Sequence, residues 1–148
     1  MLILGSGGAA RAIAFGLALH EPIATLTILG IIDEERANLV ADLRKGTKVT
    51  IHEATLNEET LGPALAQTQV LIHCTPLGMH PKVDDTCVPK HLLKADLTVM
   101  DIVYNPRETR LLREAKESGC STIPGLEMFL NQAIACLLYT SPSPRDQR

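Results

Sequence analysis

Short, continuous apolar runs alternate along this chain with longer segments whose apolar residues recur at helical spacing. The runs predict buried strands at residues 2–4, 26–29, 49–51, 70–72, 97–102 and 122–123. The helical spacing predicts helices at residues 8–19, 34–45, 58–67 and 109–118, and from Gly125 onward. Strands that are apolar throughout are typical of a parallel sheet covered by helices on both faces. The pattern therefore predicts an α/β domain with a doubly wound, Rossmann-like parallel sheet.

Polar residues and glycines predict where several of these helices begin and end. Asp33 and Thr109 stand where an N-cap side chain would accept a backbone hydrogen bond, and Gly119 stands where a left-handed residue would end a helix. Gly62 and Pro63 are expected to shorten or bend their helix. The last helix has an apolar stripe that is expected to face the core, formed by Leu126, Phe129, Leu130, Ala133, Ile134 and Leu137.

Composition narrows the classes of function. The 148 residues fit one domain, and the net charge of -3 with 3% aromatic residues argues against a nucleic-acid-binding protein. No apolar run approaches the roughly 20 residues of a membrane span. None of the four cysteines forms the C-x-x-C spacing of a metal or redox site, so we expect no metal, free thiols and a cytoplasmic protein.

A glycine-rich loop carries the first chemical signal. Residues 5–10 read GSGGAA and fit the G-x-G-x-x-A pattern between a strand and a helix. In such a loop Gly5 allows a tight turn, Gly7 lets the backbone approach a pyrophosphate, and Ala10 permits close helix–strand packing. The free N–H groups of the following helix would attract the anion. A plain tight turn is the competing explanation, and the setting favours a dinucleotide site.

The end of the second strand offers a less decisive signal about the cofactor. An acidic residue at this point binds the ribose 2′-hydroxyl of NAD, whereas an arginine accommodates the 2′-phosphate of NADP. The chain has Asp33 here, with Arg36 the nearest guanidinium. Asp33 would also serve as a helix N-cap, which is the interpretation that its position favours. Local chemistry therefore leaves the choice between NAD and NADP open.

Four motifs, in order along the chain, resemble those of shikimate dehydrogenases. Residues 5–12, GSGGAARA, are similar to the family's GAGGAARA, and residues 74–79, CTPLGM, to the end of NATPLGM. Residues 101–109, DIVYNPRET, match DVVYNPxET, and residues 119–128, GCSTIPGLEM, resemble GCKTIDGLGM. The family reduces 3-dehydroshikimate to shikimate with NADPH in chorismate and aromatic amino acid biosynthesis, and a quinate-using branch often uses NAD. The resemblance covers roughly residues 1–136, within the family's C-terminal nucleotide-binding domain.

The resemblance implies roles for individual residues. Tyr104 and Gln132 would touch the substrate, although a half-buried packing tyrosine and a solvated glutamine are the alternatives from the residues alone. Gln132 shares a helical stripe with Gly125 and Met128, and Tyr104 follows the carboxyl end of a strand, where open α/β sheets bind ligands. Cofactor contacts are implied for Gly5, Ser6, Gly7, Gly8, Ala9, Ile102 and Gly125, with Asp33 as the candidate at the ribose.

Three departures from the family pattern bear on these roles. Residues 31–33, Ile-Ile-Asp, align with the N-R-T of NADP-using members and lack its arginine, so NAD stays possible beside NADP. His73 replaces the asparagine of NATP. Pro124 and Glu127 replace the aspartate and second glycine of DGLG.

The resemblance also sets the expected domain organisation. Residues 1–136 would be the NADP-binding domain, and the family's N-terminal substrate domain, which carries a lysine and an aspartate for proton transfer, would be absent. We therefore expect no catalytic residue in this chain and no turnover by it alone. A non-catalytic dinucleotide-binding module is the alternative. Residues 137–148 resemble a translated sequencing adaptor and are expected to form a non-native, disordered tail.

Overall fold

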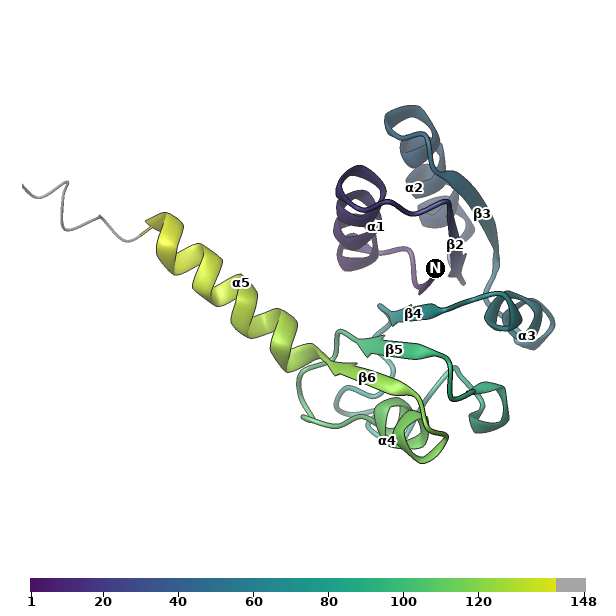
Figure 1. The fold of residues 1–148 in the computed structure, drawn as a ribbon, viewed down its shortest axis with the longest axis vertical. Helices are drawn as coiled ribbons and strands as arrows, with labels where there is room; N and C mark the ends of the chain where they lie inside the picture. The colour runs from purple at the N-terminus through teal and green to yellow at the C-terminus, as the bar shows by residue number, and fades with distance from the viewer. Residues whose placement is uncertain (141–148) are drawn as a thin grey trace, which may run out of the picture.

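The computed structural model describes residues 1–140 and shows a six-stranded parallel sheet within them (Figure 1). The strand order is β3-β2-β1-β4-β5-β6. The strands are β1 (Leu2–Leu4), β2 (Thr25–Gly30), β3 (Thr50–Thr55), β4 (Val70–His73), β5 (Thr98–Asp101) and β6 (Ser121–Pro124). The helices are α1 (Gly8–His20), α2 (Asp33–Gly46), α3 (Glu58–Ala66), α4 (Arg110–Glu117) and α5 (Gly125–Thr140), with a 3₁₀ turn at Lys90–Leu92. The predicted doubly wound fold is confirmed.

The sheet is covered on both faces because alternate residues of its central strands point to opposite sides. On β1, Leu2 and Leu4 join the core that contains Leu61 of α3 and Leu112 of α4. Between them, Ile3 joins the second core, which holds residues of α1 and α2: Ala10, Ala14, Leu39, Val40 and Leu43. Continuous apolar strands are thus explained by burial on both faces.

The order of the strands reverses beside β1. The chain builds β2 and β3 on one side of β1 and then crosses to place β4, β5 and β6 on the other. Helix α1, which follows β1, and the connection from β4 to β5 therefore pack on opposite faces of the sheet, and they leave a crevice at the carboxyl ends of β1 and β4, where doubly wound sheets bind their ligands.

The helix ends agree with the predictions at two positions and differ at a third. Thr109 caps α4 by accepting a hydrogen bond from the Leu112 N–H, and Gly119 follows α4 with a φ of +81°. The prediction that Asp33 caps α2 is wrong, because Ile32 is the N-cap and Asp33 is already the first helical residue. Its carboxylate instead pairs with Arg36, one turn along the helix, at 2.8 Å.

Two local expectations about α3 and its boundaries also change. Asn57 forms a capping box with Thr60 at the start of α3, a signal that the periodicity did not show. Pro63 is accommodated inside α3, which ends at Ala66. Among the described residues, no helix has both the length and the apolar character needed to cross a membrane.

Helix α5 departs most from expectation. It extends away from the sheet, and its last residues, 137–140, are helical where a disordered tail was predicted (Figure 1). The stripe expected to face the core is largely exposed: Phe129, Leu130, Ile134 and Leu137 are 44–62% accessible. The periodicity identified the helix correctly but not a partner for it, since only its beginning lies near β6. Residues 141–148 lie outside the described part of the chain.

Candidate functional site

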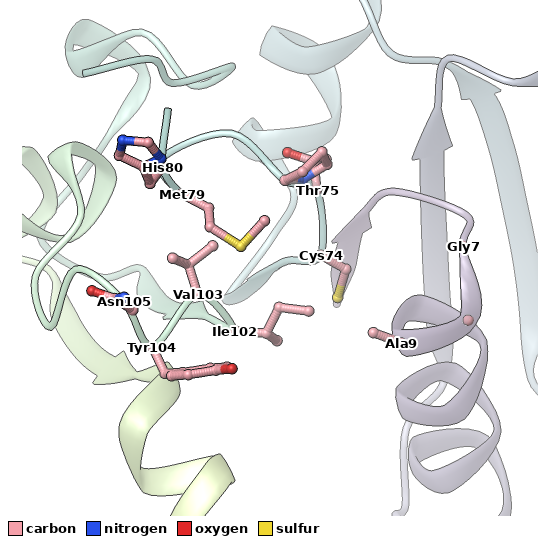
Figure 2. A pocket seen from close by; sticks show the side chains of 12 residues that line it. Gly7, Ala9, Cys74, Thr75, Met79, His80, Ile102, Val103, Tyr104 and Asn105 are labelled. Carbon is pink, nitrogen blue, oxygen red and sulfur yellow. The ribbon is translucent and has the colours of Figure 1, made fainter. Parts of the chain in front are cut away.

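A cavity of about 460 Å³ lies where the carboxyl ends of β1, β4 and β5 meet. Figure 2 shows Gly7 and Ala9 on one side of it, Cys74 and Thr75 between, and the segment from Ile102 to Asn105 on the other. Its lining comes from three segments: Gly7, Gly8 and Ala9; Cys74, Thr75, Pro76, Met79 and His80; and Ile102, Val103, Tyr104 and Asn105.

Gly5 forms the tight turn that the glycine pattern predicts. Its φ is +111°, and its N–H donates to the Leu29 carbonyl oxygen at 2.7 Å. A Cβ atom at this position would lie 2.7 Å from the carbonyl oxygen of Cys74. A side chain is therefore excluded both by the backbone conformation and by the neighbouring chain.

Gly7 plays a different part, because the space beside it is open. It is the N-cap of α1 with a φ of -73°, and a Cβ atom there would meet nothing within 4 Å. The free N–H groups in the first turn of α1 lie at the edge of the cavity, with no acidic residue in that turn. The end of α1 therefore presents backbone donors and the positive end of its dipole to an anion.

Ser6 and Gly125 support the cavity without lining it. The Ser6 side chain packs against Gly30, where a Cβ atom would lie 2.8 Å from the Ser6 Oγ. Gly125 starts α5 against the backbone that follows β5, so that a Cβ atom would lie 2.4 Å from the Ile102 carbonyl oxygen. These contacts explain why positions 30 and 125 carry glycine.

Tyr104 borders the cavity from the β5 side. Its ring is half exposed and stacks on Phe129 of α5, with centroids 4.8 Å apart and an interplanar angle of 21°. Gln132 is exposed on α5 and does not line the cavity. The structure thus brings Gly7, Gly8, Ala9, Ile102 and Tyr104 together, whereas Gln132 and Asp33 lie outside that lining.

The end of β2 is arranged around Arg36. Its Nη1 donates to the Gly30 carbonyl oxygen at 2.7 Å, and its Nη2 pairs with Asp33. The Arg36 Nε lies 3.4 Å from a carboxylate oxygen of Glu53. The Arg36 side chain is 12% exposed and the Asp33 side chain 80% exposed. A carboxylate, rather than a free guanidinium, is therefore the more accessible group here.

A buried ion pair underlies the cavity. His73 ends β4, Asp101 ends β5, and the two are direct neighbours across the sheet. The His73 Nδ1 lies 3.0 Å from the Asp101 Oδ1, and the side chains are 2% and 0% exposed. Burial acts to lower the pKa of His73, but hydrogen bonds and charge from Asp101, with a contribution from Cys87, raise the pKa to about 9. His73 is therefore an imidazolium at neutral pH.

Sequence reasoning missed this pair. The His73 side chain turns to Asp101, whereas the adjacent Cys74 lines the cavity. Burial raises the pKa of the Cys74 thiol to about 12, so it stays protonated. The departure from the NATP motif at residue 73 was the available signal. Within residues 1–140, no group of three His, Cys, Asp or Glu side chains is placed to hold a metal ion.

A family model described as the saccharopine dehydrogenase NADP binding domain matches residues 1–123. The chain belongs to this family of NADP-binding domains. The predicted resemblance to shikimate dehydrogenases is also confirmed. An NADP(+) shikimate dehydrogenase of Methanosarcina mazei is 42% identical over 145 residues, which are 97% of this chain and 51% of that protein. The chain spans about half the length of the curated relatives it matches.

Solved structures agree with this placement. A shikimate 5-dehydrogenase from Listeria monocytogenes, in complex with shikimate and NAD, superposes with a TM-score of 0.81 at 34% identity. The match covers 88% of this chain and 46% of that one. A quinate dehydrogenase from Corynebacterium glutamicum in complex with NAD gives a TM-score of 0.83 at 26% identity, covering 95% and 49% of the two chains. These neighbours have the same Rossmann-like fold.

Proposed function

We propose that this chain is the cofactor-binding half of a shikimate dehydrogenase, which reduces 3-dehydroshikimate to shikimate with NADPH. The observation that carries the proposal is the cavity that joins the N-terminus of α1 to the segment after β5. The similarity to NADP(+) shikimate dehydrogenases over nearly the whole chain supports it.

The described residues fit a dinucleotide. Open space beside Gly7 and the absence of an acidic side chain in the first turn of α1 would admit the pyrophosphate. Ile102, on the far side of the cavity, would contact the nicotinamide, with Gly125 close behind its backbone. When bound, NADPH supplies the hydride, and the protein contributes placement of the reacting groups.

The residues at the substrate end can orient but not exchange a proton efficiently. Tyr104 borders the cavity, and a tyrosine hydroxyl ordinarily titrates near pH 10. Gln132 has no titratable group in this range, and it would reach a substrate only from outside the described cavity. The lysine and aspartate implied by the family resemblance would therefore act from the other half of the enzyme, and this half alone would bind cofactor without turnover.

An NAD-dependent shikimate or quinate dehydrogenase is the second candidate. The arrangement at the end of β2 favours it, because Asp33 is exposed while Arg36 is engaged by Gly30, Asp33 and Glu53. An exposed carboxylate would accept hydrogen bonds from a ribose 2′-hydroxyl and repel a 2′-phosphate. The solved neighbours with NAD bound are consistent with this alternative.

The variant Gly7→Val tests the site directly. Because no atom lies within 4 Å of the added Cβ position, the side chain would occupy the ligand's space rather than the protein's. We expect calorimetric titration to show at least a hundredfold loss of affinity for both NADP and NAD. The matched control is Gly16→Val, also in open space but on the exposed part of α1. Unchanged affinity in Gly7→Val would remove the glycine loop from the site.

An assay of shikimate oxidation tests whether this chain is only the cofactor-binding half of the enzyme. Residues 1–148 with NADP and shikimate should show no reduction of the cofactor by absorbance at its nicotinamide band. Cofactor-dependent oxidation of shikimate by this chain alone would require a proton-transfer group within it and would contradict the proposed division of labour.

A further inference from the structure

Two segments that line the cavity are joined beneath it by the side chain of His73. On one side, the His73 Nε2 lies 2.5 Å from the Thr75 Oγ1, in the segment that follows β4. On the other, the His73 Nδ1 lies 3.0 Å from the Asp101 Oδ1, at the end of β5. An imidazolium can donate through both nitrogens at once.

Each of these contacts continues into the backbone of a lining segment. The Leu77 N–H donates to the Thr75 Oγ1 at 3.3 Å, which shapes the segment from Thr75 to Met79. The Val103 N–H donates to the Asp101 Oδ1 at 3.0 Å. The Asp101 Oδ2 accepts from the Thr109 hydroxyl at 2.6 Å, so the same carboxylate is also tied to the start of α4. His73 therefore stands at the centre of a continuous network.

The surroundings of His73 favour its charged form. Asp101 faces it from β5, and the Cys87 thiol faces it from the loop after β4. The adjacent Cys74 thiol is neutral, and the neighbouring residue on β1 is the apolar Leu4. Among the described residues, no cation acts on the pKa of His73. A buried carboxylate paired with an imidazolium is held more strongly than one paired with a neutral amide.

We propose that His73 is a positioning residue whose imidazolium fixes the segment after β4 against the segment after β5, and so holds the cavity in the shape that receives the nicotinamide dinucleotide. The inference rests on the proposed dinucleotide site. An asparagine, which the resembling family has at this position, is too short to reach both segments and carries no charge. The residue thus gives this chain a pH-dependent link that the amide cannot supply.

The test measures dinucleotide affinity by calorimetry from pH 7 to 9.5, with residues 1–148 and NADP. Wild-type affinity should be constant up to about pH 8 and fall about threefold by pH 9.5, where His73, with a pKa of about 9, has lost most of its proton. His73→Asn should bind about tenfold more weakly at pH 7 and show no further fall, since a lost charge-assisted hydrogen bond has roughly this effect. His20→Asn, at an exposed position on α1, is the matched control and should behave as wild type.

A second pair of variants keeps the His73–Asp101 ion pair and changes the Thr75 oxygen, which contacts both the His73 Nε2 and the Leu77 N–H. Thr75→Val removes the oxygen that receives the His73 Nε2–H, and it should weaken binding and remove the fall in affinity near pH 9. Thr75→Ser restores the oxygen and should restore both. Because Thr75 also lines the cavity, the presence or absence of the fall near pH 9, and not the affinity alone, reports the link to His73. This pair also decides the case if His73→Asn fails to fold.

The outcomes separate this inference from the proposed function. Failure of the wild type to bind NADP or NAD at any pH would contradict the proposed function. The positioning role of His73 can then be tested by NMR without a ligand. The amide signals of Leu77 and Val103 should both shift as the pH passes through the pKa of His73. Binding that is independent of pH, or equal affinity in His73→Asn and wild type, would overturn the positioning role while leaving the dinucleotide site intact.

Discussion

Replacement of Gly5 by alanine should destabilise the domain through two independent effects. The Gly5 φ of +111° lies outside the backbone region that residues with a Cβ atom readily adopt. The added Cβ atom would also lie 2.7 Å from the Cys74 carbonyl oxygen and 3.0 Å from its carbonyl carbon. These contacts are with backbone at the end of β4, so no side-chain rotation can relieve them.

The magnitude follows from these two effects. A left-handed conformation costs an L-residue about 1–2 kcal/mol, and forcing a methyl group into occupied space costs about 1–3 kcal/mol. The combined loss, roughly 2–5 kcal/mol, is a large share of the roughly 5–15 kcal/mol by which a domain is stable. At this chain length 1 kcal/mol corresponds to about 2–4 °C, so the melting temperature should fall by roughly 4–20 °C.

Thermal unfolding followed by circular dichroism measures this effect. Gly8→Ala is the matched control, because Gly8 lies three residues away at the start of α1 with nothing within 4 Å of its Cβ position. It should melt at or above the wild-type temperature, since alanine is favoured over glycine in a helix. A Gly5→Ala protein that melts within 2 °C of wild type, or a Gly8→Ala protein that loses as much, would refute the reasoning.

Two further predictions concern charge. Asp33→Asn should raise the affinity for NADP about threefold to tenfold and lower the affinity for NAD, as measured by calorimetry. The reason is that the exposed carboxylate would repel a 2′-phosphate and bind a ribose hydroxyl. Glu34→Gln, which removes the same charge one residue along, is the control. The contribution of His73 to stability should also depend on pH. Its folded pKa of about 9 lies above the ordinary histidine value of 6.5, so the contribution is full below pH 6.5 and is lost as the pH rises through 9. A melting temperature independent of pH between 6.5 and 9.5 would contradict this.

The fold was predictable because its central strands are buried on both faces. Leu2–Leu4 and Val70–His73 are almost wholly apolar, which is typical of strands in a parallel sheet that helices cover on both faces. The edge strand β3 was predicted only in part, because His52 and Glu53 face solvent and interrupt the apolar run. Helix caps were harder to predict. Asp33 suits either the N-cap or the first helical position, which are adjacent, and the structure has it at the first helical position.

Helix α5 shows the limit of periodicity as a signal. A stripe at i, i+3, i+4 and i+7 records that a face of the helix is apolar, but it does not identify what covers that face. In the described chain Phe129 contacts Tyr104, while Leu130 and Ile134 remain about half exposed. The same stripe would be equally visible in the sequence whether its partner lay in this chain or in another.

The two halves of the candidate site differ in how far the sequence reveals them. The turn at Gly5 and the open approach at Gly7 depend on residues within one loop, so that their spacing alone identifies them. The network around His73 depends on the register between β4 and β5, which places it opposite a residue 28 positions along the chain. Sequence periodicity contains no information on register between separate strands. A substitution in a motif, such as histidine for asparagine, therefore gains its meaning only when its partner across the sheet is known. In this protein that partner is Asp101, whose other oxygen holds Thr109 at the cap of α4, so the charge at residue 73 is coupled to a helix as well as to the cavity.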